Sequence, residues 1–508
     1  MTHNAQETPV TAAGALQMGC SLLEKGDFQE AEKFLLQAVR LTPSSPAAHA
    51  SLGQLLQRTR RAALAEKAYR HALQLRPDYA PAWAELGNLL RENLRVTDAI
   101  DCFRRALSLD PSMRAPWIGL LQLLEWANRL DEAEEALAEA KKVLPPSAPL
   151  LVAEARLLRR RSRAAEAISL LEGFSGVCEN SLQNADLLFE LGELYDAVDA
   201  ADKAFGSFAL AHECRSTAVA YNNDQFSGVI ARLRRNFTPA MGGREGEQTE
   251  PSLPTPVFLV GFPRSGTTLL DQILSSHPDV AVAEERRAVN KMVQRLASAG
   301  YPESLERLQE EDILELREIY LNEHRKYMDI GTRKIFVDKM PLNLVHAGLI
   351  RRVFPGARFI LALRHPCDAV LSCFMRKFSL RGATVLGDLA QSYDEIFDLW
   401  QHYRDILDLT VHEVRYEDVV VDFRATVSGL LDFLGLSWND AVLEFDKTAR
   451  AKGPIFTPSY HQVTEKIYTR ASGRWLRYRK HLAPVLPILA PWADKYGYTM
   501  DGQEPEKE

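Results

Sequence analysis

The chain has 508 residues, of which 46% are hydrophobic and 25% are charged. This length exceeds what one hydrophobic core usually supports, so we expect two or three domains of ordinary globular composition. The formal net charge of −7 argues against non-specific nucleic-acid binding, which requires a basic surface. The six cysteines stand far apart without a C-x-x-C pair, which predicts neither a disulfide framework nor a zinc site and favours a reducing compartment.

The two ends of the chain are predicted to be flexible, over residues 1–11 and 501–508. The first of these segments has no basic cluster followed by an apolar run, as a secretory signal would. No segment of the sequence approaches the roughly 18 apolar residues of a membrane span. We therefore expect a cytoplasmic protein that does not attach to membranes.

Residues 12–217 repeat with a period of about 34, which is typical of tetratricopeptide repeats. The clearest unit reads PAWAELGNLLRENLRVTDAIDCFRRALSLDP. Its signature positions are Trp83, Leu86, Gly87, Leu90, Ala99, Phe103, Ala106 and Pro111. About six such units follow one another, with a slip of three residues before the sixth. The pattern predicts an all-α solenoid of stacked helix pairs with a concave surface.

Two functions suit such an array, and the sequence leaves both open. The array could be a scaffold or self-association surface, or it could be a groove that binds a peptide and presents it as a substrate. Repeat arrays rarely catalyse reactions themselves. Residues 218–255, which include the Gly-, Pro- and charge-rich stretch RRNFTPAMGGREGEQTEPSLPT, are expected to be a connecting segment.

Residues 256–500 are predicted to form an α/β domain with a parallel sheet and a phosphate-binding loop. The apolar run PVFLVGF suggests a buried strand, and TTLLDQILSSH has helical spacing. Between them, GFPRSGTT has the two glycines of a P-loop, but Thr267 stands where an ATPase has lysine. Arg264 offers a cationic fork instead. Together with nearby hydroxyl groups, this suits a small anion such as a phosphosulfate, without a metal ion.

A second strand, ARFILAL, leads into the helical stretch RHPCDAVLSCFM. Arg364 stands at the end of this strand, and Ser372 lies eight residues later, close to two helical turns. Ligands of open parallel sheets bind outside the carboxyl ends of the strands. We therefore expect Arg364 and Ser372 to lie beside the P-loop.

The motifs FPRSGTTLL, AEE, DKMP and LALRHPCDAVLSCFMR together resemble sulfotransferases that use 3′-phosphoadenosine-5′-phosphosulfate. The similarity covers roughly residues 255–480, and it is greatest to tyrosylprotein sulfotransferases and to bacterial sulfotransferases fused to tetratricopeptide repeats. It implies a multidomain chain in which an all-α tetratricopeptide-repeat solenoid precedes an α/β P-loop-like sulfotransferase domain.

The resemblance also implies a role for each matching residue. Residues implied to bind the donor nucleotide are Pro263, Arg264, Ser265, Gly266, Thr267, Thr268, Arg364, Ser372, Arg376, Tyr416 and Arg474. Arg364, Ser372 and Arg376 correspond to the grip on the 3′-phosphate, while Arg474 replaces a family lysine. Residues implied to be catalytic are Glu285 as general base, Lys339 and Arg264 at the sulfate and leaving oxygen, and Ser459 near the sulfuryl group. Glu284 remains an alternative to Glu285.

The implied reaction is an in-line sulfuryl transfer that needs no metal and leaves adenosine 3′,5′-bisphosphate. A protein tyrosine is one acceptor, brought in through the repeat groove, while carbohydrate, lipid and small-molecule hydroxyls stay open, as does a homodimer. Two other functions remain. A different P-loop transferase, such as a small-molecule kinase, is disfavoured by the missing lysine. A tetratricopeptide scaffold with a non-catalytic nucleotide-binding domain would bind the donor without transferring its group.

Overall fold

The computed structural model describes residues 11–174, 180–218, 223–242, 255–330, 333–377, 385–447 and 471–501. Residue contacts divide the chain into two compact units, Met1–Cys178 and Glu179–Glu508. The first unit holds five of the predicted repeats, and the sixth groups with the second unit. None of the helices within the described ranges has the length and apolar character needed to traverse a bilayer.

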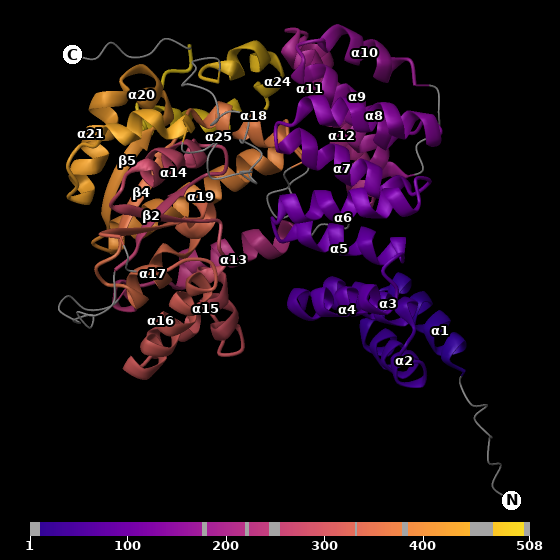
Figure 1. The fold of residues 1–508 in the computed structure, drawn as a ribbon. Coiled ribbons are helices and arrows are strands. Elements are labelled where there is room, and N and C mark those ends of the chain that lie inside the picture. The colour runs from indigo at the N-terminus through magenta and orange to yellow at the C-terminus, as the bar shows by residue number, and fades with distance from the viewer. Residues whose placement is uncertain are drawn as a thin grey trace, which may run out of the picture. The chain divides into compact units, whose positions relative to one another are not determined.

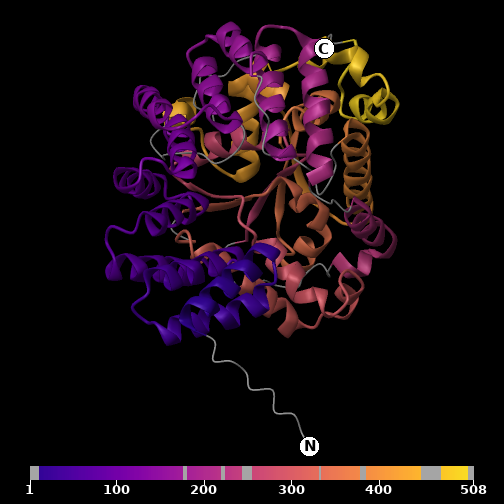
Figure 2. The ribbon, with the colours of Figure 1, turned by 90° about the vertical axis from the view of Figure 1, so that its right-hand side faces the viewer.

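The first unit is a stack of antiparallel helix pairs, coloured indigo to magenta in Figures 1 and 2. Its helices are α1 (Ala12–Lys25), α2 (Phe28–Leu41), α3 (Pro46–Arg58), α4 (Ala62–Leu75), α5 (Ala80–Glu92), α6 (Val96–Leu109), α7 (Arg114–Trp126), α8 (Leu130–Val143), α9 (Ala148–Arg160) and α10 (Ala164–Glu172). Each helix packs against the next one in sequence. The predicted repeat solenoid is confirmed.

Small residues of the repeat lie where two helices come close. A Cβ atom added to Gly87 would stand 2.7 Å from Cε1 of Phe103, so that ring occupies the space a larger residue would need. Ala99 and Ala106 are fully buried on the same helix pair. The repeat signature therefore reflects packing, as its residue types predict.

The second unit contains the remaining elements. Its α-helices are α11 (Ser181–Ala197), α12 (Ala201–Ala218), α13 (Asn223–Asn236), α14 (Thr267–Ser276), α15 (Ala288–Ala297), α16 (Glu310–Arg325), α17 (Ala347–Val353), α18 (Pro366–Phe374), α19 (Leu386–Ile406), α20 (Tyr416–Val421), α21 (Phe423–Leu434), α24 (Arg479–Leu482) and α25 (Leu486–Lys495). Its strands are β1 (Val257–Gly261), β2 (Val280–Glu284), β3 (Ile335–Lys339), β4 (Arg358–Leu363) and β5 (Thr410–Arg415). Its 3₁₀ helices are η1 (Pro239–Gly242), η2 (Glu303–Arg307), η3 (Pro341–His346), η4 (Asp440–Glu444) and η5 (Arg474–Tyr478).

The five strands form one sheet in the order β2-β3-β1-β4-β5, of which Figure 1 labels β2, β4 and β5. All neighbouring pairs are parallel, and Leu259 of the central strand is in register with Lys339 on one side and Ile360 on the other. The first strand thus lies between two later ones, which places a topological switch point beside it. The predicted parallel α/β domain is confirmed.

Helices cover both faces of this sheet. On one face, Leu259 packs in a cluster with residues of α14 and α21 such as Ile273 and Leu430. On the other face, the ring of Phe258 contacts Tyr320 of α16 at 5.9 Å between centroids. Burial on both faces explains why the strands read as continuous apolar runs rather than as alternating ones.

The expected connecting segment includes a packed helix, α13. Its apolar side chains recur at helical spacing at Phe226, Ile230 and Leu233, and all three are buried. Just after the helix, the ring of Phe237 lies 5.1 Å from that of Tyr403 on α19. The Gly- and Pro-rich residues that follow obscured this shorter periodic pattern in the sequence.

Candidate functional site

The carboxyl ends of the five strands bring the predicted site residues to one edge of the sheet. Gly261 ends β1, Glu284 ends β2 and Lys339 ends β3, while Arg364 directly follows β4 and Tyr416 directly follows β5. Segments that are more than 150 residues apart in the chain therefore meet there. This is the edge at which parallel α/β sheets bind ligands.

The P-loop runs from the end of β1 to the start of α14. Gly266 is the N-cap of α14 with φ +92°, and a Cβ added there would stand 3.0 Å from Cδ2 of Tyr416. Ser265, Thr267 and Thr268 are all buried at the beginning of the helix. Their hydroxyls and the first amides of α14 point to an anion site, since these amides have no partner within the helix.

Arg264 and Arg364 are joined around the loop. The Nε of Arg264 donates a hydrogen bond to Oγ of Ser372 at 3.1 Å, and Nη1 of Arg364 donates to the carbonyl of Arg264 at 3.1 Å. The guanidinium of Arg364 also lies 5.2 Å from the ring centroid of Tyr416. The expectation that Arg364 and Ser372 lie beside the P-loop agrees with this arrangement.

These arginines concentrate positive charge. Burial, with the nearby charges of Arg376 and Arg364, lowers the pKa of Arg264 to about 10. It remains charged at neutral pH, at an electrostatic cost that a bound anion would relieve. Within the described ranges, the buried Nε of Arg364 has no hydrogen-bond acceptor. Both observations fit a site that binds an anion.

Arg474 is tied to the same helix as Ser372. The backbone amides of Gly473 and Trp475, on either side of it, each donate to the Asp368 carboxylate at 2.8 Å. Asp368 lies in the first turn of α18, the helix that begins after Arg364. The η5 turn is thus fastened to α18, and Arg474 begins that turn.

An acidic group surrounds Lys339 at the tips of β2 and β3. The Nζ of Lys339, which is fully buried, lies 2.9 Å from Glu285 Oε1, 3.2 Å from Glu284 Oε1 and 3.9 Å from Asp271 Oδ2. Burial alone would lower the pKa of Lys339, but Asp271, Glu285 and Glu284 raise it. The lysine is therefore protonated and bridges the two glutamates.

Glu285 and Glu284 differ in backbone and exposure. The side chain of Glu285 is 45% exposed against 32% for Glu284. Glu285 has φ +48°, and its amide donates to the carbonyl of Lys339 at 2.8 Å. Because a non-glycine residue rarely adopts this conformation, the surroundings must hold it there. Glu285 is the more accessible carboxylate for a substrate.

Two features of the site are not part of the sequence motifs. Asp271 stands one helical turn after Thr267 on α14, and that spacing places it on the same face of the helix as the loop hydroxyls. On α11, Glu193 and Asp196 contact Arg376 and Arg474, respectively. Both acids belong to the sixth repeat, which the 34-residue period places in the repeat array. Ser459 lies outside the described residues.

Family models assign both parts of the chain. Residues 256–440 match the model described as sulfotransferase family, and residues 16–80 and 84–149 match the tetratricopeptide repeat. The chain joins tetratricopeptide repeats to a sulfotransferase-family domain. The residues gathered at the strand tips lie within or close to this domain.

Curated relatives agree with this assignment. A protein-tyrosine sulfotransferase of Drosophila melanogaster is 28% identical over 48% of this chain and 53% of its own length. Protein-tyrosine sulfotransferase 1 of Danio rerio is 28% identical over 46% of this chain and 70% of its own. An uncharacterised Aquifex aeolicus protein is 31% identical over 57% of this chain and 39% of its own. The chain thus spans between 39% and 70% of the length of these relatives.

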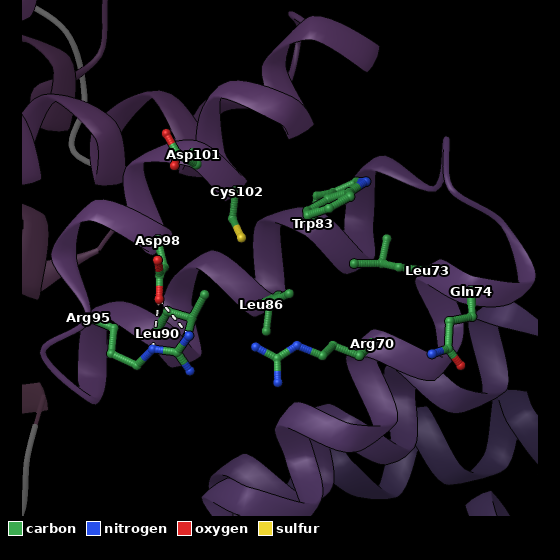
Figure 3. Close-up of a pocket in the computed structure, with 10 residues that line it drawn as sticks. All are labelled: Arg70, Leu73, Gln74, Trp83, Leu86, Leu90, Arg95, Asp98, Asp101 and Cys102. Atoms are coloured by element: carbon green, nitrogen blue, oxygen red, sulfur yellow. Dashed lines mark hydrogen bonds and ion pairs between the residues drawn. The ribbon is translucent and has the colours of Figure 1, made fainter.

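The tetratricopeptide part contains a separate cavity of about 490 Å³. It is formed by α4, α5 and α6, and its lining residues are Arg70, Leu73, Gln74, Trp83, Leu86, Leu90, Arg95, Asp98, Asp101 and Cys102. In Figure 3, Arg70 extends beside Leu86, and Arg95 contacts Asp98 at the rim. The lining combines apolar side chains such as Trp83 and Leu86 with charges of both signs.

Proposed function

We propose that the sulfotransferase-family domain transfers a sulfuryl group from 3′-phosphoadenosine-5′-phosphosulfate to an acceptor hydroxyl. The observation that carries this proposal is the meeting of two oppositely charged groups at one sheet edge. Arg264 and Arg364 follow the tips of β1 and β4, whereas Glu284 and Glu285, at the tip of β2, contact Lys339 at the tip of β3. A donor with anionic ends needs the first group, and an acceptor that must lose a proton needs the second.

The arginine group would bind the donor. The P-loop amides, with Arg264 and the hydroxyls of Ser265, Thr267 and Thr268, would surround the 5′-phosphosulfate. Arg364 and Ser372 would hold the 3′-phosphate, and the buried Nε of Arg364 is oriented without another acceptor among the described residues. The donor supplies a sulfuryl group activated as a mixed anhydride with phosphate, and the protein residues supply its orientation.

The acidic group would activate the acceptor. Glu285 would take the proton of the acceptor hydroxyl while that oxygen forms its bond to sulfur. The bond from sulfur to the phosphate oxygen breaks in the same displacement, and its electron pair stays on the departing phosphate. A positioned general base of this kind contributes about 10²–10⁴-fold to a rate.

Lys339 would serve both groups. Its ammonium, held at 2.9 Å from Glu285, would fix the position of that carboxylate for contact with the acceptor hydroxyl. The same ammonium would stabilise the charge that develops on the leaving oxygen. Because the lysine is fully buried, its effect is weakly screened by water.

We propose a tyrosine hydroxyl of a peptide as the acceptor, since relatives of this domain carry the name protein-tyrosine sulfotransferase. The repeat array would contribute by binding the peptide. A test is transfer from labelled donor to a tyrosine peptide and to its Tyr→Phe counterpart. Label on the tyrosine peptide alone supports the acceptor, whereas label on both peptides points to another hydroxyl.

Donor binding is tested first, by calorimetry with adenosine 3′,5′-bisphosphate. Arg364→Ala should weaken binding by about 10- to 100-fold, because charge-assisted hydrogen bonds contribute ~1.5–3 kcal/mol. The matched control is Arg358→Ala at the opposite end of β4, where the side chain donates to the carbonyl of Phe433. Equal affinities of the two variants, or no binding by the unmodified protein, would contradict the proposed function.

A further inference from the structure

We propose that Glu193 and Asp196, in the sixth repeat, are positioning residues of the donor site. They hold the guanidinium groups of Arg376 and Arg474 where the 3′-phosphate end of the donor binds. This inference rests on the function proposed above and extends it, because it makes the last repeat part of the sulfotransferase rather than of the array. It concerns only contacts within the second unit.

The hairpin of α11 and α12 is firmly packed onto the end of α18. The ring of Phe205 stacks on Phe374 at 5.0 Å and on His481 at 4.3 Å between centroids. Nearby, Nε2 of His212 lies 2.7 Å from the carbonyl oxygen of Phe374. These contacts fix the hairpin, so acids on α11 have defined positions relative to the site.

Asp196 gathers three side chains of the η5 turn. Its carboxylate accepts hydrogen bonds from Nε and Nη2 of Arg474, from Nη2 of Arg477 at 2.9 Å and from the hydroxyl of Tyr478 at 2.6 Å. The side chain is only 13% exposed. A mostly buried carboxylate with several charge-assisted bonds fixes the orientation of its partners far better than a surface ion pair does.

Glu193 acts in the same way on Arg376. The two side chains form an ion pair and are 16% and 28% exposed, respectively. Arg376 lies four residues after Ser372, one turn further along the chain. Its charge contributes to lowering the pKa of Arg264, and the charge of Glu193 acts on that pKa in the opposite direction. Both side chains therefore lie within electrostatic reach of the P-loop.

The geometry favours support over competition with phosphate. A guanidinium has five N–H donors and two edges that can each bind an oxyanion. Asp196 engages the edge of Arg474 that carries Nε and Nη2, and among the described residues no acceptor is assigned to Nη1, on the other edge. Glu193 pairs with Nη1 of Arg376. The acids also offset the repulsion among the clustered arginines before the donor arrives.

The same interface provides a matched control. Asp202 of α12 pairs with Lys480 and His481, but its side chain is 63% exposed and that of Lys480 is 65% exposed. Neither partner belongs to the predicted donor site. If the acids of the hairpin served only to attach it, neither Asp196→Asn nor Asp202→Asn would distinguish nucleotides with a 3′-phosphate from those without one.

The experiment measures binding of two nucleotides to Asp196→Asn, Glu193→Gln and Asp202→Asn. Both site variants should bind adenosine 3′,5′-bisphosphate about tenfold more weakly, a change of ~1.4 kcal/mol. Their loss of affinity for adenosine 5′-monophosphate, which has no 3′-phosphate, should be smaller. Asp202→Asn should change neither affinity by more than about twofold. A structural role would weaken both nucleotides equally, so equal losses overturn the inference.

A double variant tests whether Asp196 acts through Arg474. If it does, Asp196→Asn should add little to the loss already caused by Arg474→Ala, and the two effects should be non-additive. Additive effects, or tighter binding of the bisphosphate by Asp196→Asn, overturn the inference while the proposed function stands. Failure of the unmodified protein to bind the bisphosphate would overturn both.

Discussion

Left-handed backbone at non-glycine residues occurs in two regions of the molecule, and it serves a different purpose in each. Among the described residues it occurs in the repeats at Arg60, Leu94, Asn128, Ser162 and Asp199. It also occurs beside the parallel sheet, at Arg264 and Glu285. The first four are spaced by 34 residues, and the fifth follows after 37, which matches the slip before the sixth repeat. In the first repeat the same place is taken by Gly26.

The comparison separates a requirement of packing from a requirement of chemistry. In the repeats, the left-handed residue turns the chain between two helices, and side chains as different as those of Arg60, Leu94 and Ser162 occupy that place. At the strand tips, the two left-handed residues are the ones that carry the candidate donor-binding and proton-accepting groups. Such conformations cost about 1–3 kcal/mol each and persist where the surroundings enforce them.

The largest expected effect comes from removing the proposed general base at the tip of β2. Glu285→Gln should lower kcat by about 10²–10⁴-fold, because the amide cannot accept the acceptor proton. The affinity for adenosine 3′,5′-bisphosphate should change by less than about twofold, since the arginine group is intact. Turnover and calorimetric binding of the same preparation measure the two quantities.

Glu284→Gln is the matched control for this change. Glu284 is the last residue of the strand β2. Its Oε1 lies 3.2 Å from Nζ of Lys339 and its side chain is less exposed than that of Glu285, so its substitution should have a smaller effect on kcat. If Glu284→Gln instead gave the larger loss, the roles of the two glutamates would be exchanged. Parallel loss of turnover and nucleotide affinity in Glu285→Gln would indicate a structural role.

His365 extends the comparison to buried titratable groups. In the array, His49 is half-buried and His71 is exposed, whereas His365, one residue after Arg364, is buried. Its Nδ1 accepts from the amide of Cys367 at 3.2 Å, which requires an unprotonated Nδ1. Burial lowers the pKa of His365 to about 4, against about 6.5 in an unfolded chain.

The sign of the pH effect follows from this lowered pKa. Between pH 6.5 and 4 the unfolded state binds the proton and the folded state does not, so the free energy of unfolding falls as the pH falls. The full loss is about 3 kcal/mol, since each pKa unit corresponds to about 1.4 kcal/mol. Thermal unfolding between pH 7 and 4 measures it. Burial raises the pKa of Asp368 and of Glu417, which opposes the loss.

The variant His365→Asn isolates the histidine from these acids. Asparagine also caps helix N-termini but does not titrate, so the acid-side loss of stability should become smaller in the variant. A pH dependence identical to that of the unmodified protein would show that His365 does not titrate in this range.

Much of this molecule could be predicted from its sequence because its signals are local. The repeat period reports residues that pack within one hairpin, and the P-loop reports a strand, a turn and a helix that are consecutive. Asp196 and Glu193 were out of reach, because their partners lie about 180 to 280 residues further along the chain. The helix α13 was missed for another reason, since its short apolar pattern adjoins a Gly- and Pro-rich stretch.

The left-handed residue of the P-loop permits a direct test of chemistry against strain. Arg264→Gly and Arg264→Ala both remove the guanidinium and should both weaken adenosine 3′,5′-bisphosphate binding by about 10- to 100-fold. Only glycine relieves the backbone at φ +72°, so Arg264→Gly should be more stable than Arg264→Ala by about 1 kcal/mol. Chemical denaturation and calorimetry measure the two effects. Loss of affinity in the alanine variant alone would attribute binding to the backbone rather than to the charge.

The smallest expected effect comes from the same pair of substitutions in the array. Arg60 is exposed and has φ +60°, and Gly26 shows that its place in the repeat needs no side chain. Arg60→Gly should raise the free energy of unfolding by about 0.5–1 kcal/mol relative to Arg60→Ala, which keeps the strained Cβ. Neither variant should change nucleotide affinity or turnover. A change in either quantity would mean that this turn contributes to function, and the division between packing and chemistry would then fail.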